Sequence, residues 1–410
     1  MTIHPISRRG FLQGSGTLVA WAFTPRIASA APSRDPRFVA IVLRGALDGL
    51  AAVAPVGDPD YLRVRNGLVV PTSGDGAGIP LDGFFVLNPA MPVLAELYRK
   101  GEALIVHAAA SPYRERSHFD GQDVLESGQT GAGLTDTGWL NRALMKMPKG
   151  EPLTSRDVLA LGSGIPLIVR GRAPVVTLTP EGFAQPPDDT RARLLDLYNH
   201  TNPMLAAQLE RAVALAGEIG PDGAMGAGDM SGMTALPAAA RPYRLAGETA
   251  GRLLAKPDGP RIGAIGLFGW DTHQAEGPLG GRLGTLLGAL DQSIDGLRSA
   301  LGDAWKDTVA VIATEFGRTA RMNGTEGTDH GTATVAILVG GAVKGGRVIA
   351  DWPGLSDAAL YQQRDLKPTT DLRSVFKGVL RDHVGVPENA LAREVFPQSA
   401  AAKPMDGLIA

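Results

Sequence analysis

The chain has 410 residues, of which 44% are apolar and 20% charged, so it can bury a sizeable core and is not a disordered polymer. Its 40 basic and 42 acidic side chains leave a formal charge of −2, which argues against the strongly basic face that nucleic-acid binding normally requires. The chain contains no Cys, which excludes disulfides, thiolate nucleophiles and sulfur-bound metal sites.

The first thirty residues have the features of an export leader. Residues 7–12 read SRRGFL, a twin-arginine pattern, and a short apolar stretch follows it. Residues 28–30 form an A-x-A cleavage signature. The apolar stretch is too short to span a bilayer, and nothing later supplies the roughly 20 apolar residues that a span needs. We therefore expect a periplasmic or secreted protein with one domain from residue 31 to 410 and no membrane span.

Continuous apolar runs alternate with segments of helical spacing. The runs typical of buried strands are residues 38–43, 103–109, 262–268, 308–313 and 335–339. Two shorter β-branched segments, 166–169 and 174–179, are expected to pair with each other. Helices are predicted at residues 91–100, 191–200, 204–219, 279–301 and 370–383. This alternation predicts an α/β fold, a three-layer sandwich with a mostly parallel central sheet and insertions near 61–85 and 180–236.

Ligands of parallel sheets bind beyond the carboxyl ends of the strands, and polar motifs follow the first two strands here. Asp48 stands in GALDG after the first strand, where a carboxylate beside Gly can approach a cation; a common Asp-Gly turn is the alternative. After the second strand comes SPYRERSHFDGQD at 111–123, with several ionisable groups around Ser117. A solvated loop with Ser117 as a helix N-cap is the alternative there.

Three further motifs follow or precede the later strands. In GWDTH, Asp271 and His273 are two residues apart, so on extended backbone they face the same side and could bind one ion. TEFGRT places Glu315 after the next strand. TDHGT places Asp329 and His330 directly before another strand. For the GWDTH motif, a capping Asp271 and a surface His273 are the alternative.

Taken together, the exported start and five motifs resemble a bacterial family, the domain of unknown function 1501. The motifs are FVAIVLRGALDGLAAVAPVGDPDY, YRERSHFDGQDVLESG, GWDTH, TEFGRT and TDHGT, and the resemblance covers nearly all of the mature chain. It implies a core similar to the alkaline phosphatase and sulfatase superfamily, an α/β sandwich around a largely parallel sheet.

The resemblance also implies roles for individual residues. It implies that Asp48 is the early metal-binding Asp and that Ser117 is the nucleophile. It places Asp271 and His273 on a first metal with His330 as its closing ligand, and Glu315 on a second metal. Two departures affect this assignment. One residue separates Asp271 from His273 where many superfamily members have three, and Phe316 stands where a second-metal His is expected. Asp329 could supply the missing ligand.

The resulting hypothesis is an exported metal-dependent hydrolase or transferase acting on a small anionic ester of phosphate, sulfate or a related acid. The oxygen and nitrogen ligands would suit Zn, Mn, Mg or Ca, and Arg44, Arg116 and Arg318 could fork onto a tetrahedral anion. One alternative is a catalytically degenerate envelope binding or assembly protein that keeps a structural ion. A metal-free Ser-His-Asp esterase is a third, which the missing G-x-S-x-G motif disfavours.

Overall fold

The computed structural model describes residues 18–22, 35–147, 160–161, 166–173, 175–178, 198, 240–257 and 259–410. The expected helices at 191–200 and 204–219 and the insertion at 180–236 therefore lie outside the described residues, apart from position 198.

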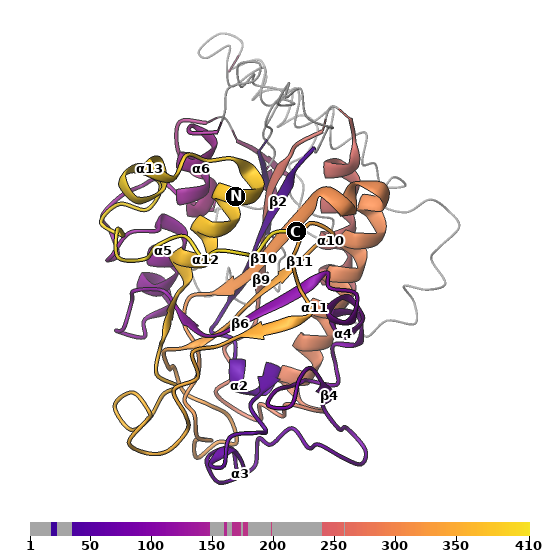
Figure 1. Ribbon diagram of the computed structural model, residues 1–410, viewed down its shortest axis with the longest axis vertical. Helices are drawn as coiled ribbons and strands as arrows, with labels where there is room; N and C mark the ends of the chain where they lie inside the picture. Colours follow the sequence, from indigo (N-terminus) through magenta and orange to yellow (C-terminus); the bar gives the residue numbers. More distant parts are fainter. Residues whose placement is uncertain are drawn as a thin grey trace, which may run out of the picture.

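A single large mixed, mostly parallel sheet organises the described chain (Figure 1). Its strand order is β12-β6-β11-β10-β2-β9-β1-β8-β7, with β13 also paired to β6. The strands are β1 (Leu18–Ala22), β2 (Arg37–Arg44), β6 (Ala103–Ala110), β7 (Ala160–Leu161), β8 (Val176–Leu178), β9 (Ile262–Phe268), β10 (Thr308–Thr314), β11 (Thr334–Val339), β12 (Arg347–Ile349) and β13 (Thr370–Asp371). A small second sheet has the order β3-β5-β4, made of β3 (Val53–Ala54), β4 (Ile79–Pro80) and β5 (Val86–Leu87).

Two strands run against the rest of the large sheet. β2 pairs in parallel with both β9 and β10, whereas β11 is antiparallel to both of its neighbours, β10 and β6. β6 consequently points the same way as β2, β9 and β10. β1 is antiparallel to β9 and β8. The carboxyl ends of β2, β6, β9 and β10 and the amino end of β11 therefore meet at one edge.

Helices flank the sheet (Figure 1). On one side lie α4 (Pro92–Arg99), α10 (Ala240–Ala255) and α11 (Arg282–Leu301), and on the other α5 (His118–Ser127), α6 (Trp139–Leu144), α12 (Leu372–Val379) and α13 (Glu388–Ala390). The short helices α2 (Gly49–Ala52) and α3 (Tyr61–Val64) follow β2. Leu167–Val169 and Gly302–Asp307 form 3-10 turns, and Leu380–Val384 and Leu391–Val395 form π turns.

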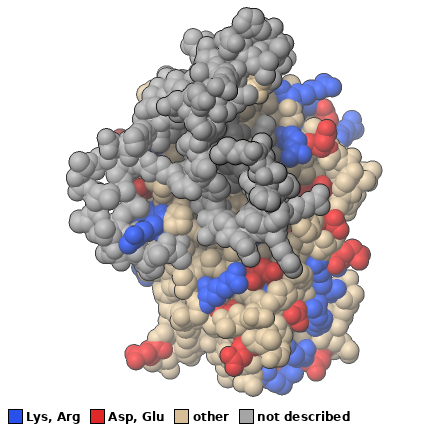
Figure 2. All heavy atoms as spheres, turned by 180° about the vertical axis from the view of Figure 1, so that it is seen from behind, with Lys and Arg blue, Asp and Glu red and all other residues tan. Residues whose placement is uncertain are grey.

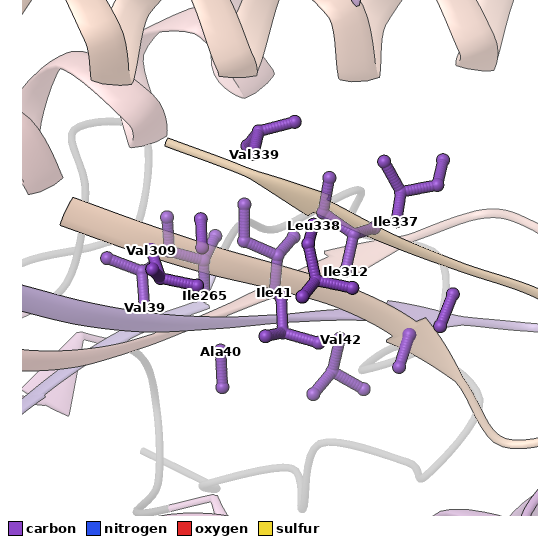
Figure 3. Close-up of a cluster of buried hydrophobic side chains, with 14 of the residues drawn as sticks. Val39, Ala40, Ile41, Val42, Ile265, Val309, Ile312, Ile337, Leu338 and Val339 are labelled. Atoms are coloured by element: carbon purple, nitrogen blue, oxygen red, sulfur yellow. The ribbon is translucent and has the colours of Figure 1, made fainter. Parts of the chain in front are cut away.

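The core lies on both faces of the central strands. Successive side chains of a strand point to opposite faces, and Figure 3 shows Ala40 and Val42 on the side of β2 away from Val39. All are at most 5% exposed, as is Ile312 of the neighbouring β10. Burial on both faces explains why these strands read as continuous apolar runs rather than as alternating ones.

The five longest predicted strands are confirmed as β2, β6, β9, β10 and β11, and the helices predicted at 91–100 and 279–301 are confirmed as α4 and α11. The strand predicted at 166–169 is wrong, because Leu167–Val169 is a 3-10 turn whose Ile168 and Val169 are buried. The pairing expected for 174–179 is also wrong, since β8 pairs with β1 and β7. The helix predicted at 370–383 begins instead with the strand β13.

The surface has charges of both signs. On the face seen in Figure 2, the described Lys and Arg side chains are interspersed with Asp and Glu. Among the described residues, none of the helices combines the length and the apolarity needed to cross a bilayer.

Candidate metal centre

Five residues from four segments meet at the edge where β2, β6, β9, β10 and β11 converge. His118 begins α5, which follows β6, while Asp271 and His273 follow β9 and Glu315 follows β10. His330 precedes β11 and reaches the same edge because that strand is reversed.

Three of these residues form a compact ligand set. His118, Asp271 and His330 each offer one ligand atom, and these atoms all lie within 4.8 Å of one another. Asp271 Oδ1 is 3.4 Å from His118 Nε2 and 3.3 Å from His330 Nε2. His273 adjoins the set, with its Nε2 3.0 Å from Asp271 Oδ1 and 2.8 Å from His330 Nε2. The group His118, Asp271 and His330 is called the metal cluster below.

Each imidazole is held at its other nitrogen by an oxygen. Nδ1 of His118 donates to Glu315 Oε1 at 2.8 Å, and Nδ1 of His330 donates to the carbonyl oxygen of Arg116 at 2.8 Å. Nδ1 of His273 lies 3.2 Å from Asp329 Oδ1. Because these oxygens can only accept, the Nδ1 atoms carry the protons, and a neutral imidazole then presents a lone pair at Nε2. Such anchoring is typical of metal-ligating His.

The spacing of the ligand atoms fits a metal ion. Bonds of about 2.0–2.2 Å from Zn²⁺ to nitrogen and oxygen place neighbouring ligand atoms roughly 3 Å apart. The Nε2 atoms of His273 and His330 lie only 2.8 Å apart. Two lone pairs at that distance repel each other unless a proton or a metal cation interacts with them. Nε2 of His118 is buried and has no well-formed hydrogen bond within the described residues. The cluster could therefore hold a metal ion.

The electrostatic field of the cluster favours positive charge. Burial opposes the charged form of His118, but Asp271 and Glu315 outweigh it and raise the pKa of His118 to about 9. Burial likewise opposes ionisation of Asp271, yet its contacts with His118, His330 and Arg318 hold the pKa of that carboxyl well below its usual range. Glu315 is fully buried, and its contact with His118 outweighs burial and lowers its pKa.

Arg318 supports Asp271 from behind. Its Nη1 donates to Asp271 Oδ1 at 2.7 Å, its Nε donates to Thr328 Oγ1 at 3.0 Å, and its Nη2 donates to the carbonyl oxygen of Thr328. Thr328 in turn donates to Glu276 Oε2 at 2.7 Å. The Arg318 side chain is 0% exposed, so its guanidinium is occupied by internal contacts rather than turned toward an external anion.

The ring of Phe316 forms a wall of the cluster. It stacks on His118 with ring centres 5.0 Å apart and lies 5.3 Å from His330. Phe316 is 1% exposed and packs with Ala46, Tyr113 and Val124. Phe316, which stands where a second-metal His was expected, therefore packs against the imidazole rings of His118 and His330.

The loops at this edge approach each other closely. Gly45 has φ +121°, and a Cβ there would lie 2.5 Å from the backbone nitrogen of Asp271. The amide of Gly45 also donates to Glu315 Oε1 at 2.9 Å. Glycine at this position allows the loop after β2 to pack against the loop that carries Asp271.

Two of the residues expected at the site have other contacts. Asp48 is 1% exposed; its carboxylate caps α2 through the amides of Leu50 and Ala51 and pairs with Arg65, and it is not part of the metal cluster. Ser117 is the N-cap of α5, where its hydroxyl accepts from the amide of Asp120 at 3.5 Å.

The other expected residues lie at or beside the cluster. Asp271 and His330 are members, and His273 adjoins it. Glu315 and Asp329 contact imidazole Nδ1 atoms rather than the ligand side of the rings.

The remaining expected arginines make internal contacts. Arg116 contacts His330 through its backbone carbonyl and pairs through its side chain with Asp365. Arg44 contacts Gln122 and Glu126.

Sequence reasoning missed His118. It stands next to Ser117 in the polar motif after β6, and the chain has only 7 His. A signal was present, because His118 lies within the same polar motif, SPYRERSHFDGQD, that predicted Ser117. The family resemblance implied a hydroxyl nucleophile, which predicted Ser117 rather than the neighbouring imidazole.

The sequence matches the model of a family described as Protein of unknown function (DUF1501) over residues 102–395. The chain belongs to the DUF1501 family. The DUF1501 match includes the whole metal cluster together with Glu315 and Asp329. Comparison of the chain with curated proteins gave no match.

Proposed function

We propose that this chain is an exported metal-dependent hydrolase or transferase that acts on a small anionic ester of phosphate or sulfate. The observation that carries the proposal is the convergence of His118, Asp271 and His330, with the Nδ1 of each imidazole anchored on an oxygen. We infer further that the sheet is an alkaline phosphatase-like core, in which ligands from several strand ends surround the reacting group.

When bound, a divalent ion would offset the negative charge of an ester and lower the pKa of a coordinated water or hydroxyl. Zn, Mn, Mg and Ca all accept nitrogen or oxygen donors, and the imidazoles favour Zn or Mn over Mg and Ca. The chain's own part is to orient the donors: Glu315 fixes His118, Arg116 fixes His330 and Arg318 fixes Asp271.

Ser117 is the proposed nucleophile. It directly precedes His118, and it lies at the N-terminus of the ten-residue helix α5, where free amides favour a negatively charged oxygen. The hydroxyl of Ser117 accepts a long, weak hydrogen bond of 3.5 Å from the backbone amide of Asp120, so the capping contact constrains the hydroxyl little.

The test is a screen of metal-loaded full chain with aryl phosphate and aryl sulfate, in the wild type, His330→Ala and Ser117→Ala. We expect turnover in the wild type, loss of ion and turnover in His330→Ala, and loss of turnover with retained ion in Ser117→Ala. Turnover by His330→Ala at the wild-type rate would contradict the metal site. Turnover by Ser117→Ala would instead assign Ser117 a capping role alone.

The second candidate function is a binding or assembly protein that keeps a structural ion. Phe316 favours it, because a buried phenyl ring rather than an imidazole stands beside His118 and leaves that position without a ligand atom. A wild-type chain that binds an ion but cleaves neither ester would support this candidate over hydrolysis.

A further inference from the structure

Two arginines share one buried carboxylate next to the metal cluster. Arg116 donates from Nε and Nη2 to Asp365 Oδ2, at 3.0 and 2.7 Å. Arg364 donates from Nη1 to the other oxygen, Asp365 Oδ1, at 3.1 Å. Asp365 is 0% exposed. Two guanidinium charges against one carboxylate leave the trio with a net positive charge.

Both arginines form hydrogen bonds with His330, a member of the metal cluster. The carbonyl oxygen of Arg116 accepts from His330 Nδ1 at 2.8 Å, and Arg364 Nη1 donates to the carbonyl oxygen of His330 at 2.8 Å. Arg116 has φ +62°, a left-handed conformation that is uncommon outside glycine. The pair is thus fixed directly beside His330.

Each guanidinium keeps donors to spare. Nη1 of Arg116 and the Nε and Nη2 atoms of Arg364 have no hydrogen-bond partner among the described residues, and the two side chains are 21% and 40% exposed. Arg318 differs, because its side chain is 0% exposed and bonds to Thr328 and Asp271.

We propose that Arg116 and Arg364 form the site that recognises the tetrahedral oxyanion of the substrate. Guanidinium groups match the oxygens of phosphate and sulfate in a fork geometry, and the shared Asp365 holds both in place before the ligand arrives. This inference rests on the proposed function, since it supplies the anion-binding part of the same site. It also selects Arg364, a residue outside the motifs that first indicated the site.

The experiment measures binding of inorganic phosphate and inorganic sulfate to the full chain by calorimetry, with and without added Zn²⁺. Wild type is compared with Arg364→Gln and with the control Arg321→Gln. Arg321 is also 40% exposed; it donates to the carbonyl oxygen of Gln363 at 2.9 Å and pairs with Asp357, and among the described residues it makes no hydrogen bond or ion pair with His330.

We expect Arg364→Gln to weaken anion binding about tenfold or more, as for loss of a charged hydrogen bond, while its zinc content and circular dichroism stay at wild-type levels. Arg321→Gln should bind phosphate within about twofold of wild type. Arg364→Lys, which keeps the charge but loses the fork, should fall between wild type and Arg364→Gln.

Unchanged phosphate and sulfate affinity in Arg364→Gln would overturn the proposal, and so would an equal loss in Arg321→Gln, which would show a general charge effect. These outcomes leave the hydrolase proposal standing. If the wild type binds no zinc but its anion binding still depends on Arg364, the arginine pair is supported and a zinc-dependent function fails.

Discussion

At the scale of single residues, the candidate site depends on the groups that hydrogen-bond to the ligand side chains and orient them. Glu315, Asp329 and the backbone of Arg116 each fix one imidazole, and Arg318 fixes Asp271. These supports decide which nitrogen carries the proton and therefore which one can face a cation.

The substitution Glu315→Gln tests this support. Because Gln carries no charge and accepts more weakly from His118 Nδ1, we expect metal affinity to fall by about 10- to 100-fold. The control is Glu126→Gln, since Glu126 is also buried but pairs with Arg44 and accepts from the amide of Ile168. Competition with a coloured chelator measures both affinities, and an equal loss in the two variants would contradict a specific role for Glu315.

Motif spacing predicted Asp271, His273 and His330 together because each stands directly beside a strand that reads as an apolar run. Asp48 fits the same rule, yet it caps α2 and pairs with Arg65. That partner lies 17 positions further along the chain, at the C-cap of the short helix α3, so no local pattern could predict the pair. Arg364 was missed for a similar reason, because its relation to His330 is made only by tertiary contact.

At the scale of elements, the reversed direction of β11 brings His330 to the other residues of the metal cluster. An apolar run does not encode whether a strand is parallel or antiparallel, since burial on both faces gives the same composition. The sequence therefore predicted β11 as a strand but not its reversal, which places His330 at the edge where β9 and β10 end.

Packing of α4 against α11 depends on a buried carboxylate. Asp291 of α11 accepts from the amides of Val93 and Leu94 in the first turn of α4, at 3.0 and 2.9 Å. Burial outweighs these hydrogen bonds and raises the pKa of Asp291 to about 6. The amides at the start of a helix otherwise lack partners, so this contact joins the two helices.

The raised pKa of Asp291 predicts a pH dependence of stability. Between about pH 4, the unfolded value, and pH 6 the folded chain binds a proton that the unfolded chain does not. The contribution is fully present below pH 4 and is lost as the pH rises through 6. Relative to Asp291→Asn, the wild type should therefore gain a few degrees in Tm between pH 7 and pH 4. A constant Tm difference would contradict the assignment.

At the scale of the whole molecule, part of the predicted export leader is also a strand of the large sheet. Residues 18–22 lie within the expected leader, and they also form β1, which pairs with β9 along five residues. Removal of the leader would leave that edge of β9 without β1. Export through a twin-arginine signal remains our proposal.

Intact-mass measurement of protein from the periplasmic fraction tests the leader. We expect a chain that begins at Ala31, because Ala28, Ser29 and Ala30 form the cleavage signature. The double variant Arg8→Lys, Arg9→Lys should keep the full-length chain in the cytoplasm. A periplasmic chain that retains residues 18–22 would show instead that β1 is a permanent strand.

Metal content tests the central claim most directly. Full chain is purified from cells supplied with zinc and manganese, and each ion is counted per chain by elemental analysis, with Asp271→Asn and His330→Ala as matched variants. The account predicts one bound ion per wild-type chain and its loss from both variants. A wild type without stoichiometric metal, or variants that retain it, would contradict the account.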